Sequence, residues 1–210
     1  MNRFFVEKRN IGRAVIKITD SDDVHHLVRV LRLGPGEDVF ISDGEGGGYI
    51  AEIEKIAKNS VVLKIKDAQK RRQKGDGKII VTLACAIPKN ARFARFEDIV
   101  DKATQLGVSE IVPLLTERTL IERRAFDKNQ ERFKRSIIAA AKQSGALFLP
   151  ELREAIPFET LISRLGQYEL CLLPNLSDRT HFLKDVVSGF KGKRILVLIG
   201  PEGDFTKREI

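Results

Sequence analysis

The chain has 210 residues, 42% of them hydrophobic, which is enough for one large domain or two modest ones. Its longest apolar run, residues 195–199, is strand-sized, so the sequence predicts no membrane span of about 20 residues, and the N-terminus lacks the apolar core of a secretion signal. The formal charge of +8 favours a polyanionic partner, nucleic acid before a membrane surface, and we expect a cytoplasmic protein.

The two cysteines, Cys85 and Cys171, each fall in a stretch that we expect to be a buried strand. They are far apart in the sequence, and we interpret them as small core residues rather than as a disulfide or a metal site. The sequence contains no Walker loop, His-Glu-x-x-His, Gly-x-Ser-x-Gly or Cys-x-x-Cys pattern. This argues against NTPase, metalloprotease, hydrolase and zinc functions, and we expect no bound metal.

The N-terminal part is predicted to be a small β-rich domain with one helix. Its expected strands are residues 4–6, 14–18, 37–42, 49–53 and 60–65. The segment Asp20-Ser21-Asp22-Asp23 supplies cap residues for a helix that begins near Val24. An apolar stripe with helical spacing is expected to face the core, and it consists of Val24, Leu27, Val28 and Leu31.

A second face of this helix is basic. His25, Arg29 and Arg32 have the spacing i, i+4, i+7 and could donate to RNA phosphates or base edges. A solvated basic face beside the helix C-terminus explains the same pattern equally well. His26 could equally be a packing residue.

Residues 43–48 are rich in glycine and follow a predicted strand. A phosphate loop would need a helix after it to donate its amides, whereas residues 49–53 alternate as a strand, so a hairpin turn is favoured. Residues 66–78 are polar, basic and without apolar period, which predicts a linker; we place the domains at 1–70 and 79–210, with the linker at 71–78.

The C-terminal part alternates strand and helix patterns, which predicts a parallel sheet with helices on both sides. The expected strands are residues 79–86, 110–115, 168–173 and 195–199, and the expected short helices are 158–165 and 180–187. Two longer helices should face the core. Their inward residues are Phe93, Phe96, Ile99, Val100, Ala103 and Leu106 in the first, and Phe133, Ile137, Ala140 and Ala141 in the second, which Gly145 should end.

The last strand leads into Gly200-Pro201-Glu202-Gly203. Two glycines allow a sharp bend and a close approach to a ligand, and ligands of parallel sheets lie beyond the carboxyl ends of strands. An ordinary strand-to-helix turn is the alternative. Residues 206–209 form a capping box, Thr-x-x-Glu, that should open a helix, so we expect the sequence to continue beyond Ile210. A Rossmann domain would carry its glycines after the first strand, which argues against NAD-type binding.

Seven short segments, taken together, resemble the RsmE family of 16S rRNA uridine-N3 methyltransferases, which are SPOUT-superfamily, SAM-dependent enzymes. The segments are Arg3-Phe4-Phe5-Val6, His25 to Arg32, Asp43-Gly44, Lys102 to Val108, Pro113 to Arg118, Gln143-Ser144-Gly145 and Ile199 to Gly203. The resemblance implies an α/β protein with a PUA-like N-terminal β-barrel that binds RNA and a C-terminal parallel-sheet domain with a trefoil knot. It also implies a homodimer that acts on 16S rRNA of the 30S subunit.

The resemblance implies site residues as well. SAM would be bound by Leu173, Pro174, Leu198, Ile199, Gly200, Pro201, Glu202 and Gly203. RNA would be held by Arg3, His25, His26, Arg29 and Arg32. Arg118 and Glu202 are the visible candidates to orient the target base, with the main catalytic cation expected from a further C-terminal segment.

The sequence also departs from the family's pattern. Asp204 stands where the family usually has glycine, Lys142 where it has glutamate and Ala146 where it has a basic residue. The family's closing motif, which completes the knot and the SAM pocket, does not occur in these 210 residues. We therefore expect this form to bind SAM poorly. Two other functions remain open: a non-catalytic RNA-binding ribosome-assembly factor, and a SPOUT methyltransferase with another RNA target.

Overall fold

The computed structural model describes residues 1–69, 79–89, 93–175 and 181–210, so the predicted linker at 71–78 lies outside the described residues. The chain divides into two compact units. The first contains Met1–Asp76 and Ala141–Leu149, and the second contains Gly77–Ala140 and Pro150–Ile210. Among the described helices, none is both long and apolar enough to cross a membrane.

The first unit is built on a five-stranded sheet in the order β1-β3-β4-β5-β2. Its strands are β1 (Arg3–Phe5), β2 (Val15–Ile18), β3 (Asp38–Ser42), β4 (Gly48–Ala57) and β5 (Ser60–Ala68), and a short 3-10 helix, η1, spans Lys8–Asn10. β1 runs parallel to β3, and the other neighbours are antiparallel. The predicted β-rich domain is confirmed. The linker does not begin at residue 66, however, because Lys66 lies in β5 and its Nζ bonds Asp38 at 2.9 Å.

The single helix of this unit begins earlier than predicted. The Asp20 carboxylate accepts hydrogen bonds from the amides of Asp22 and Asp23, so α1 spans Ser21–His25 and does not start near Val24. A π-helical turn, η2 (His26–Val30), follows. Val24 and Leu27 are buried as expected. Arg32 lies beyond the helix with a φ of 54°, so the predicted basic row of three does not share one helix face.

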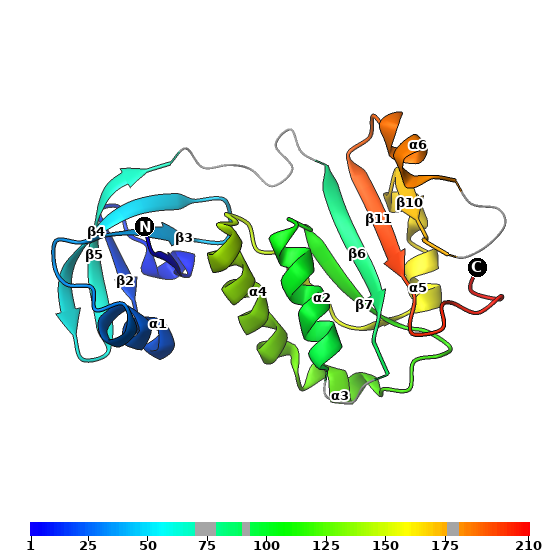
Figure 1. Ribbon diagram of the computed structural model, residues 1–210, viewed down its shortest axis with the longest axis horizontal. Helices are drawn as coiled ribbons and strands as arrows, with labels where there is room; N and C mark the ends of the chain where they lie inside the picture. The colour runs from blue at the N-terminus through cyan, green and yellow to red at the C-terminus, as the bar shows by residue number, and fades with distance from the viewer. Residues whose placement is uncertain (70–78, 90–92, 176–180) are drawn as a thin grey trace. The chain divides into compact units, whose positions relative to one another are not determined.

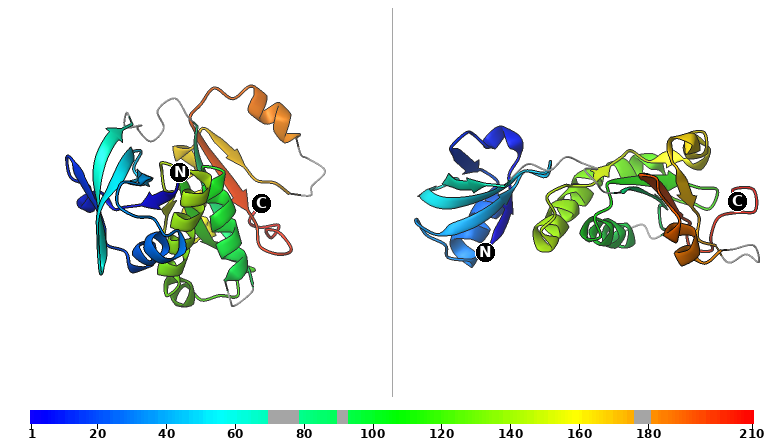
Figure 2. Two further views of the ribbon diagram at one scale, coloured as in Figure 1. Left: turned by 60° about the vertical axis from the view of Figure 1, so that its left-hand side comes forward. Right: turned by 90° about the horizontal axis from the view of Figure 1, so that it is seen from above.

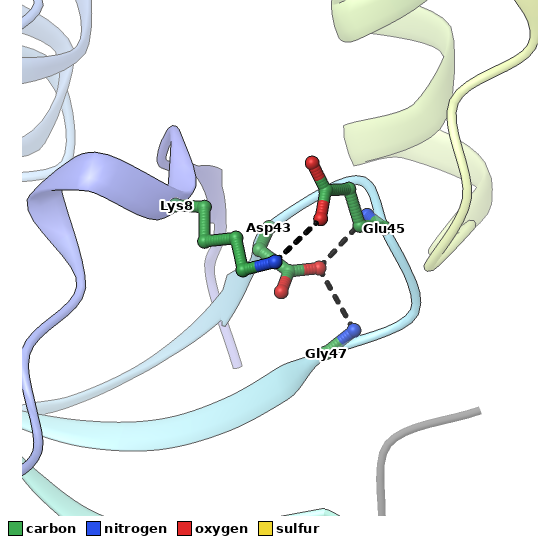
Figure 3. Close-up of polar contacts among 4 residues, drawn as sticks. All are labelled: Lys8, Asp43, Glu45 and Gly47. Carbon is green, nitrogen blue, oxygen red and sulfur yellow. Dashed lines mark hydrogen bonds and ion pairs between the residues drawn. The ribbon is translucent and has the colours of Figure 1, made fainter. Parts of the chain in front are cut away.

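Residues 43–48 form the predicted hairpin turn, since β3 and β4 pair antiparallel up to Ser42 and Gly48. The buried carboxylate of Asp43 accepts hydrogen bonds from the amides of Glu45 and Gly47, each at 2.8 Å, as Figure 3 shows. Lys8 binds the Glu45 carboxylate at 3.1 Å. The outer edge of this turn pairs with residues 147–149 through two backbone hydrogen bonds of 2.9 Å. The glycine run therefore forms a structural turn in this unit.

The second unit contains a parallel sheet in the order β10-β11-β6-β7-β8, with β9 also pairing β7. Figure 1 shows the strands β10, β11, β6 and β7 of this sheet. The strands are β6 (Ile80–Ala86), β7 (Glu110–Leu115), β8 (Glu151–Leu152), β9 (Ile156–Pro157), β10 (Leu170–Leu172) and β11 (Arg194–Ile199). The last strand in the chain thus pairs with the first strand of its unit. The predicted parallel sheet is confirmed.

Helices cover this sheet on both sides, and Figure 2 shows α2 and α5 on opposite faces. They are α2 (Ala94–Gln105), α3 (Arg123–Asp127), α4 (Gln130–Ser144), α5 (Phe158–Ile162), the 3-10 turn η3 (Leu165–Gln167) and α6 (Leu183–Ser188). Phe96, Phe126 and Phe133 are fully buried and pack ring to ring with centroids 4.9–5.0 Å apart. This cluster holds α2, α3 and α4 together.

Two predicted core positions are wrong. Leu106 is 85% exposed, because α2 ends at Gln105 and Gly107, with a φ of 82°, turns the chain away. Cys171 is exposed, since it lies in β10 at the edge of the sheet, whereas Cys85 in the central strand β6 is buried as predicted. Burial raises the pKa of the Cys85 thiol to about 12, which fits an unreactive core residue.

Candidate functional site

The carboxyl ends of four neighbouring strands meet at one edge of the second sheet. Because β10, β11, β6 and β7 are parallel, the segments that follow them emerge on the same side. Their register is nearly level, since Ile199 pairs with Cys85 and Cys85 pairs with Pro113. Figure 1 shows the red C-terminal segment beyond these strand ends. Residues 200–204, which we call the glycine loop, therefore lie where a parallel sheet binds its ligands.

The glycine loop is tightly folded. A Cβ on Gly200 would lie 3.1 Å from the backbone nitrogen of Phe205, so a side chain at this position would crowd the loop. Gly203 and Asp204 follow each other with φ values of 90° and 66°. Asp204 holds this left-handed conformation, which suits the family's glycine better, while its carboxylate accepts a 2.8 Å hydrogen bond from the Phe205 amide. The buried Phe205 ring packs 5.2 Å from that of Phe158.

Glu202 joins the loop to the segment that follows β6. One carboxylate oxygen accepts a hydrogen bond from the Lys89 amide at 3.1 Å, and the other binds the Arg95 guanidinium at 2.6 Å. The pKa of Glu202 is lowered, first by the hydrogen bond from the Lys89 amide and also by Arg95. The carboxylate is thus ionised at neutral pH.

Arg118 joins the loop to the segment that follows β7. Its guanidinium donates hydrogen bonds to the backbone carbonyls of Gly203 and Asp204, the second at 3.0 Å. Among the described residues Arg118 has no carboxylate partner. The sequence places Arg118 and Glu202 84 residues apart, yet the fold brings both to the same loop.

The remaining predicted cofactor residues flank this loop. Leu173 and Pro174 directly follow β10, the neighbour of β11. The Leu198 side chain is buried in the core under α5, whereas Ile199 is 38% exposed beside the loop. Among the described residues, the amides of Gly200 and Gly203 have no hydrogen-bond partner. Free donors beside a partly exposed apolar side chain fit an adenosyl ligand, which carries both acceptors and an apolar face.

The predicted capping box is formed in part. The Glu209 carboxylate accepts a hydrogen bond from the Thr206 amide at 2.9 Å, as a capping box requires, but the Thr206 hydroxyl has no partner among the residues that the structure describes. The same carboxylate accepts a hydrogen bond from the Glu117 amide at 3.0 Å. The pattern predicted the box but not this second bond, and it also missed the roles of Lys89 and Arg95. Their only signal was their place after a buried strand.

The predicted RNA residues all lie in the first unit. His25, His26, Arg29 and Arg32 are exposed, although the His26 ring also packs edge-on to Phe4 at 6.4 Å. The Arg3 guanidinium lies 4.9 Å over the Phe40 ring and against Gly145, so this cation also has a packing role. Lys142, one of the departures from the family, binds the largely buried Asp23 at 2.5 Å.

A family profile described as RNA methyltransferase domain matches residues 76–210, and one described as RNA methyltransferase PUA domain matches residues 18–66. The chain belongs to this RNA methyltransferase family. The resemblance to RsmE and the expected combination of a PUA-like domain with a parallel-sheet domain are confirmed.

Several relatives named Ribosomal RNA small subunit methyltransferase E match nearly the whole chain. The protein of Rickettsia conorii is 27% identical over 209 residues, which cover 100% of this chain and 81% of the relative. The protein of Bacillus subtilis is 26% identical over 220 residues, covering 100% and 84%. The Synechocystis relative is 30% identical over 210 residues, and the chain spans 66% of its length while 99% of this chain is covered.

Solved structures share the fold. A methyltransferase of Legionella pneumophila in complex with the bound cofactor SAM has a TM-score of 0.82 and 25% identity, covering 99% of this chain and 82% of its own. A probable rRNA-methyltransferase of Porphyromonas gingivalis has a TM-score of 0.79 and 27% identity, covering 100% and 83%.

Proposed function

We propose that this protein transfers a methyl group from SAM to N3 of a uridine in the 16S rRNA of the small ribosomal subunit. The observation that carries this proposal is the glycine loop, in which the Gly200 and Gly203 amides have no partner in the described part of the chain. The loop lies at the ligand-binding edge of a sheet in a member of an RNA methyltransferase family. The names of the small-subunit relatives and the SAM complex of the Legionella relative support the choice of substrate and cofactor.

The residues proposed to hold SAM are those predicted from the sequence. They are Leu173, Pro174, Leu198, Ile199, Gly200, Pro201, Glu202 and Gly203. Leu198 would contribute its backbone to the SAM site, because its side chain is buried in the core. We further propose residues 1–70 as the RNA-binding domain, with Arg3, His25, His26, Arg29 and Arg32 on the RNA, and residues 79–210 as the methyltransferase domain. A homodimer in the cytoplasm belongs to the same proposal.

The chemistry asks little of the chain beyond positioning. SAM supplies an already activated methyl group, so the protein has to orient the uridine and exclude water. Uridine N3 must lose its proton before it can attack, and a base or a cation near the two flanking carbonyl oxygens would assist this loss. The catalytic roles predicted for Arg118 and Glu202 remain predictions. The ionised Glu202 is bound on both oxygens, one by Arg95 and one by Lys89.

The test is the transfer of labelled methyl from SAM to 30S subunits that lack the modification, with naked 16S rRNA alongside. The complete gene product should label a single uridine at N3, and nuclease digestion followed by mass spectrometry would identify it. Label on another RNA would redirect the assignment to another target. RNA binding without any methyl transfer would contradict the proposal and favour a non-catalytic assembly factor.

A further inference from the structure

Among the described residues outside the glycine loop and β11, only Arg118 has a side chain that donates hydrogen bonds to the carbonyl groups of the loop. Its guanidinium contacts the carbonyl oxygens of Gly203 and Asp204, two consecutive residues with positive φ. Positive φ is a costly conformation for Asp204, and it persists only where the surroundings fix it. Satisfying two adjacent carbonyls with one charged donor is such a constraint.

The segment that carries Arg118 is itself held rigidly. The Thr119 hydroxyl accepts a hydrogen bond from the Thr116 amide at 2.9 Å, and the Thr119 amide donates to the Thr116 carbonyl at 3.0 Å. Thr116 directly follows β7 and is buried. Arg118 therefore projects from a closed turn, which lowers the backbone entropy that is lost when its side chain binds the loop.

The hydrogen bonds from Arg118 connect segments that follow two strands separated by a third. β6 lies between β11, which precedes the loop, and β7, which precedes Arg118. The Glu209 carboxylate makes a second link over the same distance, because it accepts from both the Thr206 and the Glu117 amides. Next to the loop, after the neighbouring strand β6, the Lys89 amide and the Arg95 guanidinium bind the Glu202 carboxylate. The loop is thus fastened over the carboxyl end of β6 from two directions.

We propose that Arg118 is a positioning residue that holds the glycine loop in the shape that binds SAM, and that it is not the cation that acts on the uridine. This inference rests on the proposed function. The guanidinium is engaged by carbonyl groups of the loop itself, so its contribution is to the shape of the loop. The Gly200 and Gly203 amides, which no described group accepts from, lie on the same loop, and their direction depends on the backbone that Arg118 holds.

The first measurement is SAM binding by calorimetry in the wild type, Arg118→Ala and Arg118→Lys. Losing hydrogen bonds from a charged donor should raise the SAM dissociation constant about ten-fold or more in the alanine variant. The lysine variant keeps the charge but is one bond shorter, so it should lie between. Arg164→Ala is the matched control, because Arg164 is exposed in the same unit and its side chain makes no hydrogen bond or ion pair with a described residue; the SAM affinity of this variant should be unchanged.

The second measurement separates positioning from catalysis. At saturating SAM and 30S subunits, Arg118→Ala should keep kcat within about three-fold of the wild type, because the loss is in cofactor binding. An unchanged SAM affinity with a large fall in kcat would overturn the inference and make Arg118 catalytic. An unchanged affinity with an unchanged kcat would overturn it as well.

Hydrogen exchange of the cofactor-free protein tests the loop directly. The Asp204 amide bonds the Pro201 carbonyl at 2.9 Å and the Phe205 amide bonds the Asp204 carboxylate, so both should exchange faster in Arg118→Ala than in the wild type or in Arg164→Ala. Equal exchange rates would contradict the inference. If the wild type binds no SAM at all, the proposed function fails, whereas this exchange comparison still decides whether Arg118 holds the loop.

Discussion

Glu202 lies in the glycine loop, but its carboxylate is bound by groups from the segment that follows another strand, β6. Its two carboxylate oxygens are bound by groups that follow β6, the Lys89 amide and the Arg95 guanidinium, although the side chain is 37% exposed. A carboxylate that is hydrogen-bonded on both oxygens is a poor general base but a good anchor. This geometry makes the pH dependence of cofactor binding a useful probe of the residue.

The pKa of Glu202 is lowered in the folded protein, chiefly by the Lys89 amide. Its contacts therefore contribute above the ordinary glutamate pKa of about 4.3 and are lost as pH falls through the lowered folded value. We expect SAM affinity to be flat from neutral pH down to the ordinary glutamate pKa of about 4.3 and to fall only below it, as pH passes through the lowered pKa of Glu202. Glu202→Gln should bind SAM more weakly at neutral pH and should lack the acid-side fall. Calorimetric titrations of both proteins over this range check this, and identical acid-side profiles would refute it.

At the scale of elements, the hairpin between β3 and β4 depends on Asp43. Asp43→Ala should lower the free energy of unfolding by about 1–3 kcal/mol, because it leaves the Glu45 and Gly47 amides without their acceptor. Glu45→Ala is the control. It removes an ion pair to Lys8 whose side chains are 57% and 62% exposed, and exposed pairs contribute less than about 1 kcal/mol. Urea unfolding measures both, and equal losses would argue against the role of Asp43.

Most elements could be predicted from the sequence because their patterns are local. The apolar run of β11 and the stripe of Phe133 and Ile137 on α4 need only the period of a strand or a helix. The errors have a different origin. Leu106 continues the apolar period past the end of α2, and Cys171 is exposed because β10 lies at an edge. Local pattern reports neither strand order nor the residue at which a helix stops.

The site likewise has parts that a local pattern predicts and parts that depend on the order of the strands. The glycine loop could be predicted from one short segment, whereas its bonds to Arg118 and Arg95 join residues 85 and 107 positions apart. These pairs depend on β11 lying next to β6 and one strand from β7, an order that no local period encodes. Polar residues that directly follow buried strands were the available signal.

At the scale of the whole molecule, the net charge of +8 favours RNA but does not say where RNA binds. If Arg29 and Arg32 contact phosphates, the double variant with alanine should bind 16S rRNA more weakly. Each lost phosphate contact should also flatten the plot of log affinity against log salt concentration by about 0.7–0.9. Filter binding over a range of salt concentrations measures this. Lys55→Ala with Lys58→Ala is the control of equal charge, and the same change of slope in both would argue against a local site.

The pairing of β6 with β11 sets the order in which this protein can be completed during its synthesis. Ile80 is made early and its partner Arg194 more than a hundred residues later, so for most of translation the central strand has one vacant edge. An open apolar edge is a site for unwanted pairing between nascent chains. We therefore expect that a ribosome stalled before residue 194 presents a chain that chaperones bind and proteases cut, and that protection appears abruptly once β11 has left the exit tunnel.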